Sequence, residues 1–289
     1  MQIREALQKS KSSLTESSTP ELDARLLLSK ILSLTHEELL LSYQEELPDC
    51  HRESFFEYIK RRKSGEPVAY IIGKQELYGL DFIVDKNVLI PRPETELLVD
   101  HVISDHNKND KSKPIKILEL GTGSGAISIA LAKNISASKI TALDISNKAL
   151  CIAKKNAKLH QLERQIDFIT SDWYSKLESR EDSFNKYDYI VSNPPYISKQ
   201  DIDQMSVEAR KFEPEIALYA SENGLVSYKA IISGASRYLK SEGKLILEIG
   251  YNQRDAVVAL CKKYNFQEII TKKDVAGLDR IVIVQSARI

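Results

Sequence analysis

The apolar residues of the first 72 positions recur at helical spacing. One stripe is formed by Leu22, Leu26, Leu27 and Ile31. Such a stripe predicts an amphipathic helix, which Pro20 can begin because its missing N–H costs nothing at the first helical position. Thr35, followed three residues later by Glu38, is a capping box that begins the next helix, and residues 55–59 carry the apolar face of a third. We predict a small all-helical domain over residues 1–72.

The pattern changes to short strand-like runs after this domain. Residues 75–78 and 80–84 have the composition of two strands joined by a turn at Gly79. We therefore predict a β-hairpin linker over residues 73–90. Residues 94–106 then return to a helical pattern.

From residue 115 onward, apolar strands alternate with helices. The predicted strands are 115–120, 139–143, 166–170, 187–191, 244–248 and 280–284, and the predicted helices are 126–133, 148–160, 224–239 and 252–264. This alternation is typical of βαβ crossovers, which give a mainly parallel sheet with helices on both faces. We predict a doubly wound, Rossmann-like α/β domain over residues 91–289. Its polar tract at residues 107–113 is predicted to be a solvated loop.

Composition and charge narrow the possible functions. Lysine plus arginine equals aspartate plus glutamate at 41 each, so the formal net charge is zero. Proteins that make many phosphate contacts are usually basic, so direct nucleic-acid binding is not expected. No run reaches the ~18 apolar residues of a membrane span, the amino terminus lacks the apolar core of a secretory signal, and the cysteines are isolated. We predict a cytoplasmic monomer that does not bind membranes.

A glycine-rich loop follows the first strand of the α/β domain. It reads Gly121, Thr122, Gly123, Ser124 and Gly125. Glycines allow a sharp turn and a close approach of a ligand to the backbone, and Asp144 ends the next strand, where a carboxylate can accept the hydroxyls of a ribose. The same loop satisfies the NAD pattern through Ala126, so a dehydrogenase stays open. Glu119 before the loop and the third glycine favour S-adenosylmethionine.

A second motif follows the strand at residues 187–191 and consists of Asn193, Pro194, Pro195 and Tyr196. An amide or aromatic amine nitrogen is a poor nucleophile because its lone pair is delocalised. If its two N–H groups donate to the Asn193 side-chain oxygen and the Pro194 carbonyl, the lone pair can be aimed at a methyl donor. The prolines stiffen the loop and Tyr196 offers a flat face for stacking. A polar turn is the alternative, but the preceding glycine loop favours methyl transfer.

Two further residues follow the strand at 166–170. Asp172 can bond an adenine amino group, and Trp173 can cover the face of a purine. A tryptophan buried in the core is the competing interpretation.

Several segments together carry a family resemblance. They are residues 21–24, 67–73, 88–96, 212–215 and 276–280, with the glycine loop, Asp144 and the Asn193–Tyr196 motif. With these segments the chain resembles the HemK/PrmC family of peptide chain release factor glutamine methyltransferases. The Asn-Pro-Pro-Tyr motif alone is shared with nucleic-acid adenine methyltransferases, whereas residues 90–96 joined to a short helical domain are more particular to this family.

The resemblance implies methylation of the glutamine side-chain amide in the Gly-Gly-Gln motif of class-one release factors, with S-adenosylmethionine as cofactor and no metal. Residues 121–125, Asp144, Trp173 and Asn193 would hold the cofactor, and residues 193–196 the glutamine. The helical domain, residues 1–72, contains no residue cluster that looks chemical, so we predict that it recognises the substrate, with plain packing as the alternative. The alternatives are an adenine methyltransferase acting on DNA or RNA, and a binding module without activity.

Overall fold

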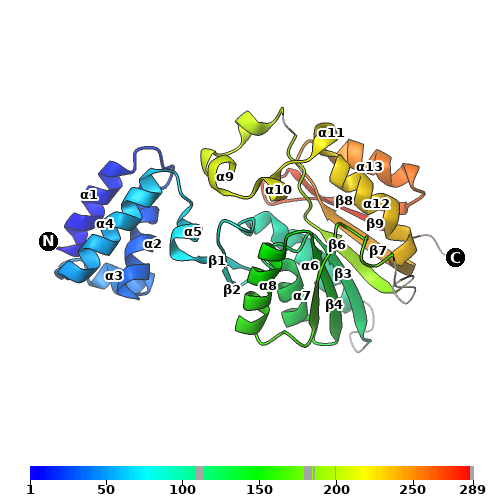
Figure 1. The fold of residues 1–289 in the computed structure, drawn as a ribbon, viewed down its shortest axis with the longest axis horizontal. Coiled ribbons are helices and arrows are strands. Elements are labelled where there is room, and N and C mark those ends of the chain that lie inside the picture. Colours follow the sequence, from blue (N-terminus) through cyan, green and yellow to red (C-terminus); the bar gives the residue numbers. More distant parts are fainter. Residues whose placement is uncertain (109–112, 179–183, 185, 199, 287–289) are drawn as a thin grey trace. The chain divides into compact units, whose positions relative to one another are not determined.

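The computed structural model describes residues 1–108, 113–178, 184, 186–198 and 200–286. It divides into two compact units (Figure 1). The helical unit comprises Met1–Lys74 and Met205–Glu213, and the sheet unit comprises Gln75–Gln204 and Pro214–Ile289. Across the described residues, no helix is long and apolar enough to cross a membrane.

Six helices form the described part of the helical unit. They are α1 (Ile3–Ser13), α2 (Pro20–Leu32), α3 (His36–Leu41), α4 (Asp49–Lys63), α5 (Val68–Ile72) and α9 (Val207–Phe212). The predicted capping box of α3 is present, because Glu38 N–H donates to Thr35 Oγ1 over 3.2 Å and Thr35 N–H donates to Glu38 Oε2 over 2.7 Å. The predicted all-helical character of this region is confirmed.

The buried face of α2 differs from the predicted stripe. Leu22 and Leu26 are exposed, whereas Ala24, Leu27 and Leu28 are buried in the core of the unit. The buried face is rotated about the helix axis relative to the predicted stripe, and it includes Asp23, a charged residue that a hydrophobic pattern would place in solvent. Ion pairing makes this burial possible.

That ion pair is part of a buried network around Arg62 of α4. Arg62 Nε donates to Asp23 Oδ2 over 2.6 Å, and another guanidinium N–H donates to Glu208 Oε1 over 2.5 Å. The side chains of Arg62 and Asp23 are only 5% and 6% exposed, so removal of either partner would leave a buried charge uncompensated. Glu208 lies on α9, far away in sequence. The network thereby joins residues 205–213 to the helices of the first 74 residues, which the sequence did not predict.

The predicted hairpin is confirmed as β1 (Lys74–Leu77) and β2 (Leu80–Ile83). The two residues between the strands, Tyr78 and Gly79, have positive φ angles of 55° and 70°. Positive φ at both central positions is the requirement of a type I′ turn, whose twist matches that of the flanking strands.

A seven-stranded sheet forms the centre of the sheet unit. Its strands are β3 (Ile115–Leu120), β4 (Ser138–Asp144), β5 (Ile166–Thr170), β6 (Tyr187–Ser192), β7 (Leu239–Glu248), β8 (Gln267–Lys273) and β9 (Asp279–Gln285). The order is β5-β4-β3-β6-β7-β9-β8, parallel except that β9 is antiparallel to both neighbours. The predicted doubly wound, mainly parallel sheet is confirmed. Its topological switch point lies between β3 and β6, where such sheets bind ligands.

Two strand predictions were incomplete. β8 was missed because it is an edge strand with only two consecutive isoleucines between polar residues, and an edge strand can keep such residues in water. β7 begins at Leu239, five residues before the predicted start, because the polar residues 240–243 precede its apolar part. The preceding helix accordingly ends at Tyr238.

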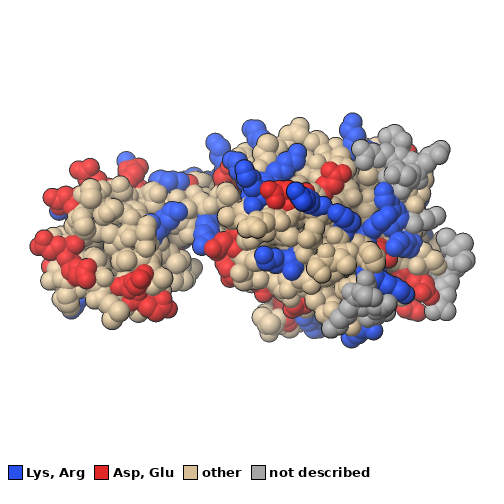
Figure 2. Space-filling view, turned by 90° about the horizontal axis from the view of Figure 1, so that it is seen from below, with Lys and Arg blue, Asp and Glu red and all other residues tan. Residues whose placement is uncertain are grey.

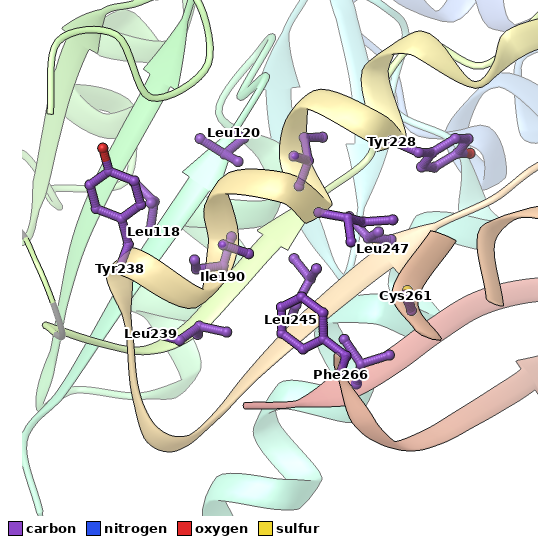
Figure 3. Packing of buried hydrophobic residues seen from close by; sticks show 14 of the residues in the cluster. Leu118, Leu120, Ile190, Tyr228, Tyr238, Leu239, Leu245, Leu247, Cys261 and Phe266 are labelled. Carbon is purple, nitrogen blue, oxygen red and sulfur yellow. The ribbon is translucent and has the colours of Figure 1, made fainter. Parts of the chain in front are cut away.

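Helices cover both faces of the sheet. The longer ones are α6 (Glu96–Lys108), α7 (Ala126–Asn134), α8 (Asn147–Leu159), α12 (Val226–Tyr238) and α13 (Arg254–Lys263), and the short ones are η1 (Pro93–Thr95), η3 (Ile202–Gln204), α10 (Glu215–Leu218) and α11 (Ser221–Gly224). On one face, Leu118, Leu120 and Leu245 pack against α12 and α13 (Figure 3). Side chains alternate along a strand, so Glu119 points to the opposite face, which α7 covers. Of the predicted loop at 107–113, residues 107 and 108 belong to helix α6, and residues 109–112 lie outside the described part.

Candidate active site

A cavity of about 290 Å³ lies at the carboxyl ends of β3, β4 and β6 in the sheet unit. It brings together nine of the predicted site residues, namely Gly121, Thr122, Gly123, Ser124, Asp144, Asp172, Trp173, Asn193 and Pro195. The other three predicted residues, Gly125, Pro194 and Tyr196, are not part of the lining among the residues described. The local motifs thus converge on one cavity at the switch point.

The glycine loop presents bare backbone to the cavity. Gly121 and Gly123 have φ angles of 73° and 56°, and no atom lies within 4 Å of the position that a Cβ would take at either residue. Gly125 has a different role. A Cβ there would lie 3.2 Å from Ala153 Cβ on α8, so this glycine allows the close packing of α7 on α8.

Asp144 holds the glycine loop in place. Gly123 N–H donates to its Oδ2 and Ser146 N–H donates to its Oδ1, both over 2.8 Å. Burial raises the pKa of Asp144 above its usual value, and the two backbone hydrogen bonds oppose that rise. Each carboxylate oxygen can accept more than one hydrogen bond, so Asp144 can hold the loop and still accept ligand hydroxyls.

Glu119 is the most deeply buried carboxylate of this loop region, at 1% exposure. Its Oε2 accepts hydrogen bonds from the Thr122 hydroxyl at 2.7 Å and from the Ser128 N–H and hydroxyl. Its Oε1 has no hydrogen-bond partner within the described structure, although Glu119 lines the cavity. Burial raises the pKa of Glu119 to about 7. A buried oxygen without a partner beside a cavity is suited to a cationic ligand group.

Asn156 of α8 supports the glycine loop, and no local pattern in the sequence pointed to this residue. Its side chain is fully buried, accepts from Ile83 N–H at 2.7 Å, and donates to the Ile83 and Ser124 carbonyls at 3.0 and 2.9 Å. One amide side chain therefore joins the hairpin strand β2 to the glycine loop.

Trp173 lies between the core and the cavity. It is half-buried, packs against the core cluster and lines the cavity. Its φ angle is 42°, which is unusual for a bulky residue, and the Ser171 hydroxyl donates to its carbonyl over 2.7 Å. Asp172 beside it is exposed. Strained backbone of this kind is concentrated at functional sites.

The Asn193–Tyr196 loop is anchored by contacts that lie far away in sequence. Gln253 Nε2 donates to the Tyr196 carbonyl over 2.9 Å. A Cβ on Gly224 would lie 2.1 Å from that carbonyl oxygen, so only glycine fits there. Pro194 is buried, and burial raises the pKa of Tyr196 to about 12. Sequence reasoning missed Gln253 and Gly224, because neither lies near the motif in the chain.

The Asn193 side chain enters a buried hydrogen-bond chain. Its Nδ2 donates to Thr95 Oγ1 over 3.2 Å, and Thr95 Oγ1 donates to Glu248 Oε2 over 2.8 Å. Glu248 lies at the end of β7, and burial raises its pKa to about 7. Arg92 and Thr95 also line the cavity. Arg92 and Thr95 lie within the family segment at residues 88–96, but the sequence assigned no contact to either residue and did not single out Glu248.

Two exposed isoleucines border the cavity and were not predicted. Ile145 is 51% exposed and follows Asp144, and Ile216 is 57% exposed on α10. Large apolar side chains in water beside a cavity are suited to contact a flat apolar ligand surface. The position of Ile145 directly after the acidic strand end was the available signal for it.

Comparison with known proteins assigns the chain to a family. The PrmC N-terminal domain family matches residues 5–73, and the Methyltransferase small domain family matches residues 93–212. The release factor glutamine methyltransferase of Coxiella burnetii is 38% identical over 286 residues, which cover 99% of both chains. The chain belongs to the release factor glutamine methyltransferase family.

The chain is also similar to part of some longer proteins. A bifunctional methyltransferase of Rickettsia conorii is 37% identical over 287 residues, which cover 92% of this chain and 54% of that protein. The chain thus spans about half the length of such relatives. A solved protein-(glutamine-N5) methyltransferase (release factor-specific) from Alicyclobacillus acidocaldarius is 26% identical, with a TM-score of 0.44 over 71% of this chain and 99% of that chain.

Proposed function

We propose that this protein uses S-adenosylmethionine to methylate the side-chain amide nitrogen of the glutamine in the Gly-Gly-Gln motif of class-one release factors. It would act in the cytoplasm as a monomer. The observation that carries the proposal is the position of Asn193, which lines the same cavity as the glycine loop. The full-length relative named for this activity supports the choice of substrate.

The cavity residues fit S-adenosylmethionine. The unpartnered Glu119 Oε1 suits its ammonium group, and the bare faces of Gly121 and Gly123 admit a ligand close to the backbone. Asp144 is placed to accept the ribose hydroxyls. Asp172 would bond the adenine amino group and Trp173 would cover its face, as the sequence predicted. When bound, this cofactor supplies a methyl group activated by a sulfonium.

The Asn193 loop would orient the acceptor amide. The Asn193 Oδ1 and the Pro194 carbonyl accept its two N–H groups, which directs the nitrogen lone pair toward the methyl donor. The stiff prolines keep these acceptors in place, and Tyr196 stacks on the planar amide. The nitrogen loses its proton after methyl transfer, when it has become strongly acidic.

Mass spectrometry of an acceptor distinguishes this function from adenine methylation, which would need the same two hydrogen-bond acceptors. The protein is incubated with labelled S-adenosylmethionine, a class-one release factor and, separately, DNA and RNA. One methyl group on the Gly-Gly-Gln glutamine is expected. Label found only in nucleic acid, or found nowhere, would overturn the proposal.

The helical domain, residues 1–72, is proposed to recognise the release factor. The cavity and its polar residues all lie in the sheet unit, so the helical unit is free to contact the remote parts of a protein substrate. Figure 2 shows acidic side chains gathered on its displayed face. In the segment from residue 37 to residue 57, seven acidic residues stand against one arginine, and Leu41 on α3 is 85% exposed among them.

A single exposed leucine tests this recognition role. Leu41→Ser should raise the KM for the intact release factor roughly 5–10-fold, the size expected for one interface contact, and leave the KM for a free Gly-Gly-Gln peptide unchanged. Val275→Ser is the matched control, because Val275 is an exposed apolar residue of the sheet unit. Equal effects of the two substitutions on the protein substrate would remove α3 from the recognition surface.

A further inference from the structure

A hydrogen-bond chain connects three segments of the sheet unit that are distant in sequence. Asn193 follows β6, Thr95 ends η1, and Glu248 ends β7. Asn193 Nδ2 donates to Thr95 Oγ1 over 3.2 Å, and Thr95 Oγ1 donates to Glu248 Oε2 over 2.8 Å. Thr95 and Glu248 are 4% and 2% exposed, so solvent does not compete for the bond between them.

The chemistry of the three groups fixes the direction of the chain. An ionised carboxylate only accepts hydrogen bonds, and a hydroxyl has a single proton to donate. The Thr95 hydroxyl must therefore give its proton to Glu248, and its lone pair is left to accept from Asn193. This arrangement requires the NH2 of the Asn193 amide to face Thr95. The Oδ1 is then directed away from Thr95.

We propose that Thr95 and Glu248 are positioning residues, which hold the Asn193 amide in the one orientation that offers its oxygen to the substrate nitrogen. This inference rests on the proposed function of Asn193 as an acceptor. In the flipped orientation, Asn193 would present its NH2 to the substrate NH2. Two donors would then face each other, and the hydrogen bond between the substrate nitrogen and Asn193 would not form. Neither positioning residue needs to touch the glutamine.

The charge on Glu248 controls this orientation. A protonated Glu248 could donate to Thr95, which could then donate to the Asn193 Oδ1 and stabilise the flipped amide. Burial raises the pKa of Glu248 to about 7, against the lowering effects of the Thr95 hydrogen bond and Arg280. Four other titratable or charged groups influence Glu248. They are Arg92, directly before η1, Glu94, within η1, Tyr196 of the Asn193–Tyr196 loop, and Tyr228 of α12. Turnover should therefore rise with pH through about 7.

Three variants of the full chain test the inference at saturating S-adenosylmethionine. Thr95→Val keeps the shape and removes the hydroxyl, and it should lower kcat roughly 10–100-fold while the affinity for S-adenosylmethionine changes less than about twofold. Thr95→Ser should restore most of kcat because it restores the hydroxyl. Thr141→Val is the matched control: it removes a hydroxyl that is likewise hydrogen-bonded, at 3.2 Å to Tyr187, outside the cavity lining.

Glu248→Gln provides an independent reading, which holds even if Thr95→Val fails to fold. A glutamine can donate or accept, so the direction of the chain is lost at every pH. The rise of kcat through about pH 7 should disappear, and the value above that pH should fall by roughly 10-fold. A Glu248→Gln enzyme that keeps the wild-type pH profile, or a Thr95→Ser enzyme as slow as a folded Thr95→Val enzyme, would overturn the inference.

The choice of acceptor separates this inference from the proposed function. If the wild-type protein methylates adenine in nucleic acid and not the release factor, the proposed function is wrong. The same kcat ratios, measured on the acceptor that is methylated, still decide the role of Thr95 and Glu248, because an adenine amino group also presents two N–H donors, one to the Asn193 oxygen and one to the Pro194 carbonyl.

Discussion

Two buried glutamates serve the site and differ in what they leave unpaired: Glu119 lines the cavity, whereas Glu248 is connected to it through Thr95, which lines it. Glu119 near the end of β3 and Glu248 at the end of β7 are 1% and 2% exposed, and burial raises the pKa of each to about 7. Glu119 keeps one oxygen without a partner among the described residues. Glu248 accepts from Thr95, which in turn accepts from Asn193.

This difference teaches how one type of side chain can serve two purposes. A buried oxygen without a partner gains most from a ligand that brings a charged donor, so Glu119 is suited to binding. A carboxylate that already has a protein donor acts through that donor, so Glu248 is suited to orienting another side chain. Substitutions around the two glutamates should therefore separate affinity from turnover.

Asn193→Ala should produce the largest loss. It removes a preorganised acceptor for the reacting amide, so kcat should fall by a factor on the order of 10²–10³. Binding of the release factor should change little, because the protein surface that contacts it is intact. Steady-state kinetics on the intact release factor measure the effect, with circular dichroism to confirm folding. A variant that keeps half of its turnover would show that the acceptor mechanism is wrong.

Asp144→Ala should act instead on affinity. It removes a carboxylate placed for the ribose hydroxyls and releases the Gly123 N–H, so S-adenosylmethionine binding should weaken by roughly 2–3 kcal/mol. Titration calorimetry measures this directly. At saturating cofactor, kcat should fall much less than in Asn193→Ala. Unchanged cofactor affinity would remove Asp144 from the ribose role.

Glu119→Gln should, apart from its effect on cofactor binding, change the stability of the cofactor-free protein, by less than the loss of turnover in Asn193→Ala. A carboxyl whose pKa is raised from 4.5 to about 7 on folding binds its proton more tightly in the folded state, so its contribution to stability is complete below about pH 4.5 and is lost as the pH rises through about 7. The free energy of unfolding without cofactor should therefore fall between pH 5 and pH 8 by about 2–3 kcal/mol more in the wild type than in the variant. Urea unfolding at both pH values checks this. An equal change in the free energy of unfolding for the wild type and the variant would contradict it.

The sequence predicted the parts of the fold and the site that have local signals. The glycine loop, Asp144 and Asn193 each follow an apolar strand, and parallel strands bring their carboxyl ends to one edge of the sheet. Thr95 and Glu248 have no such signal, because their role depends on a contact across 153 positions of the chain.

The missed features of the fold have the same origin. The rotated buried face of α2 depends on Arg62, 39 positions after Asp23, and the edge strand β8 is held by β9 in place of its own apolar pattern. Asn156 binds Ile83 and Ser124, which precede it in the chain by 73 and 32 positions. The periodicity of apolar residues predicts which face of one helix or strand is buried. The roles of these residues instead depend on contacts with residues that are distant in sequence and meet only in the folded chain.

The Arg62 network has a consequence for exchanging domains between relatives. The helical unit includes residues 205–213, so its sequence is not one continuous cassette. A chimera that replaces only residues 1–74 would combine a foreign Arg62 environment with the original Glu208, and the swapped helices would have to accommodate an α9 from another parent. An exchange at a single boundary therefore separates Arg62 from the Glu208 of its own parent. We expect that a functional chimera needs residues 1–74 and residues 205–213 from the same protein.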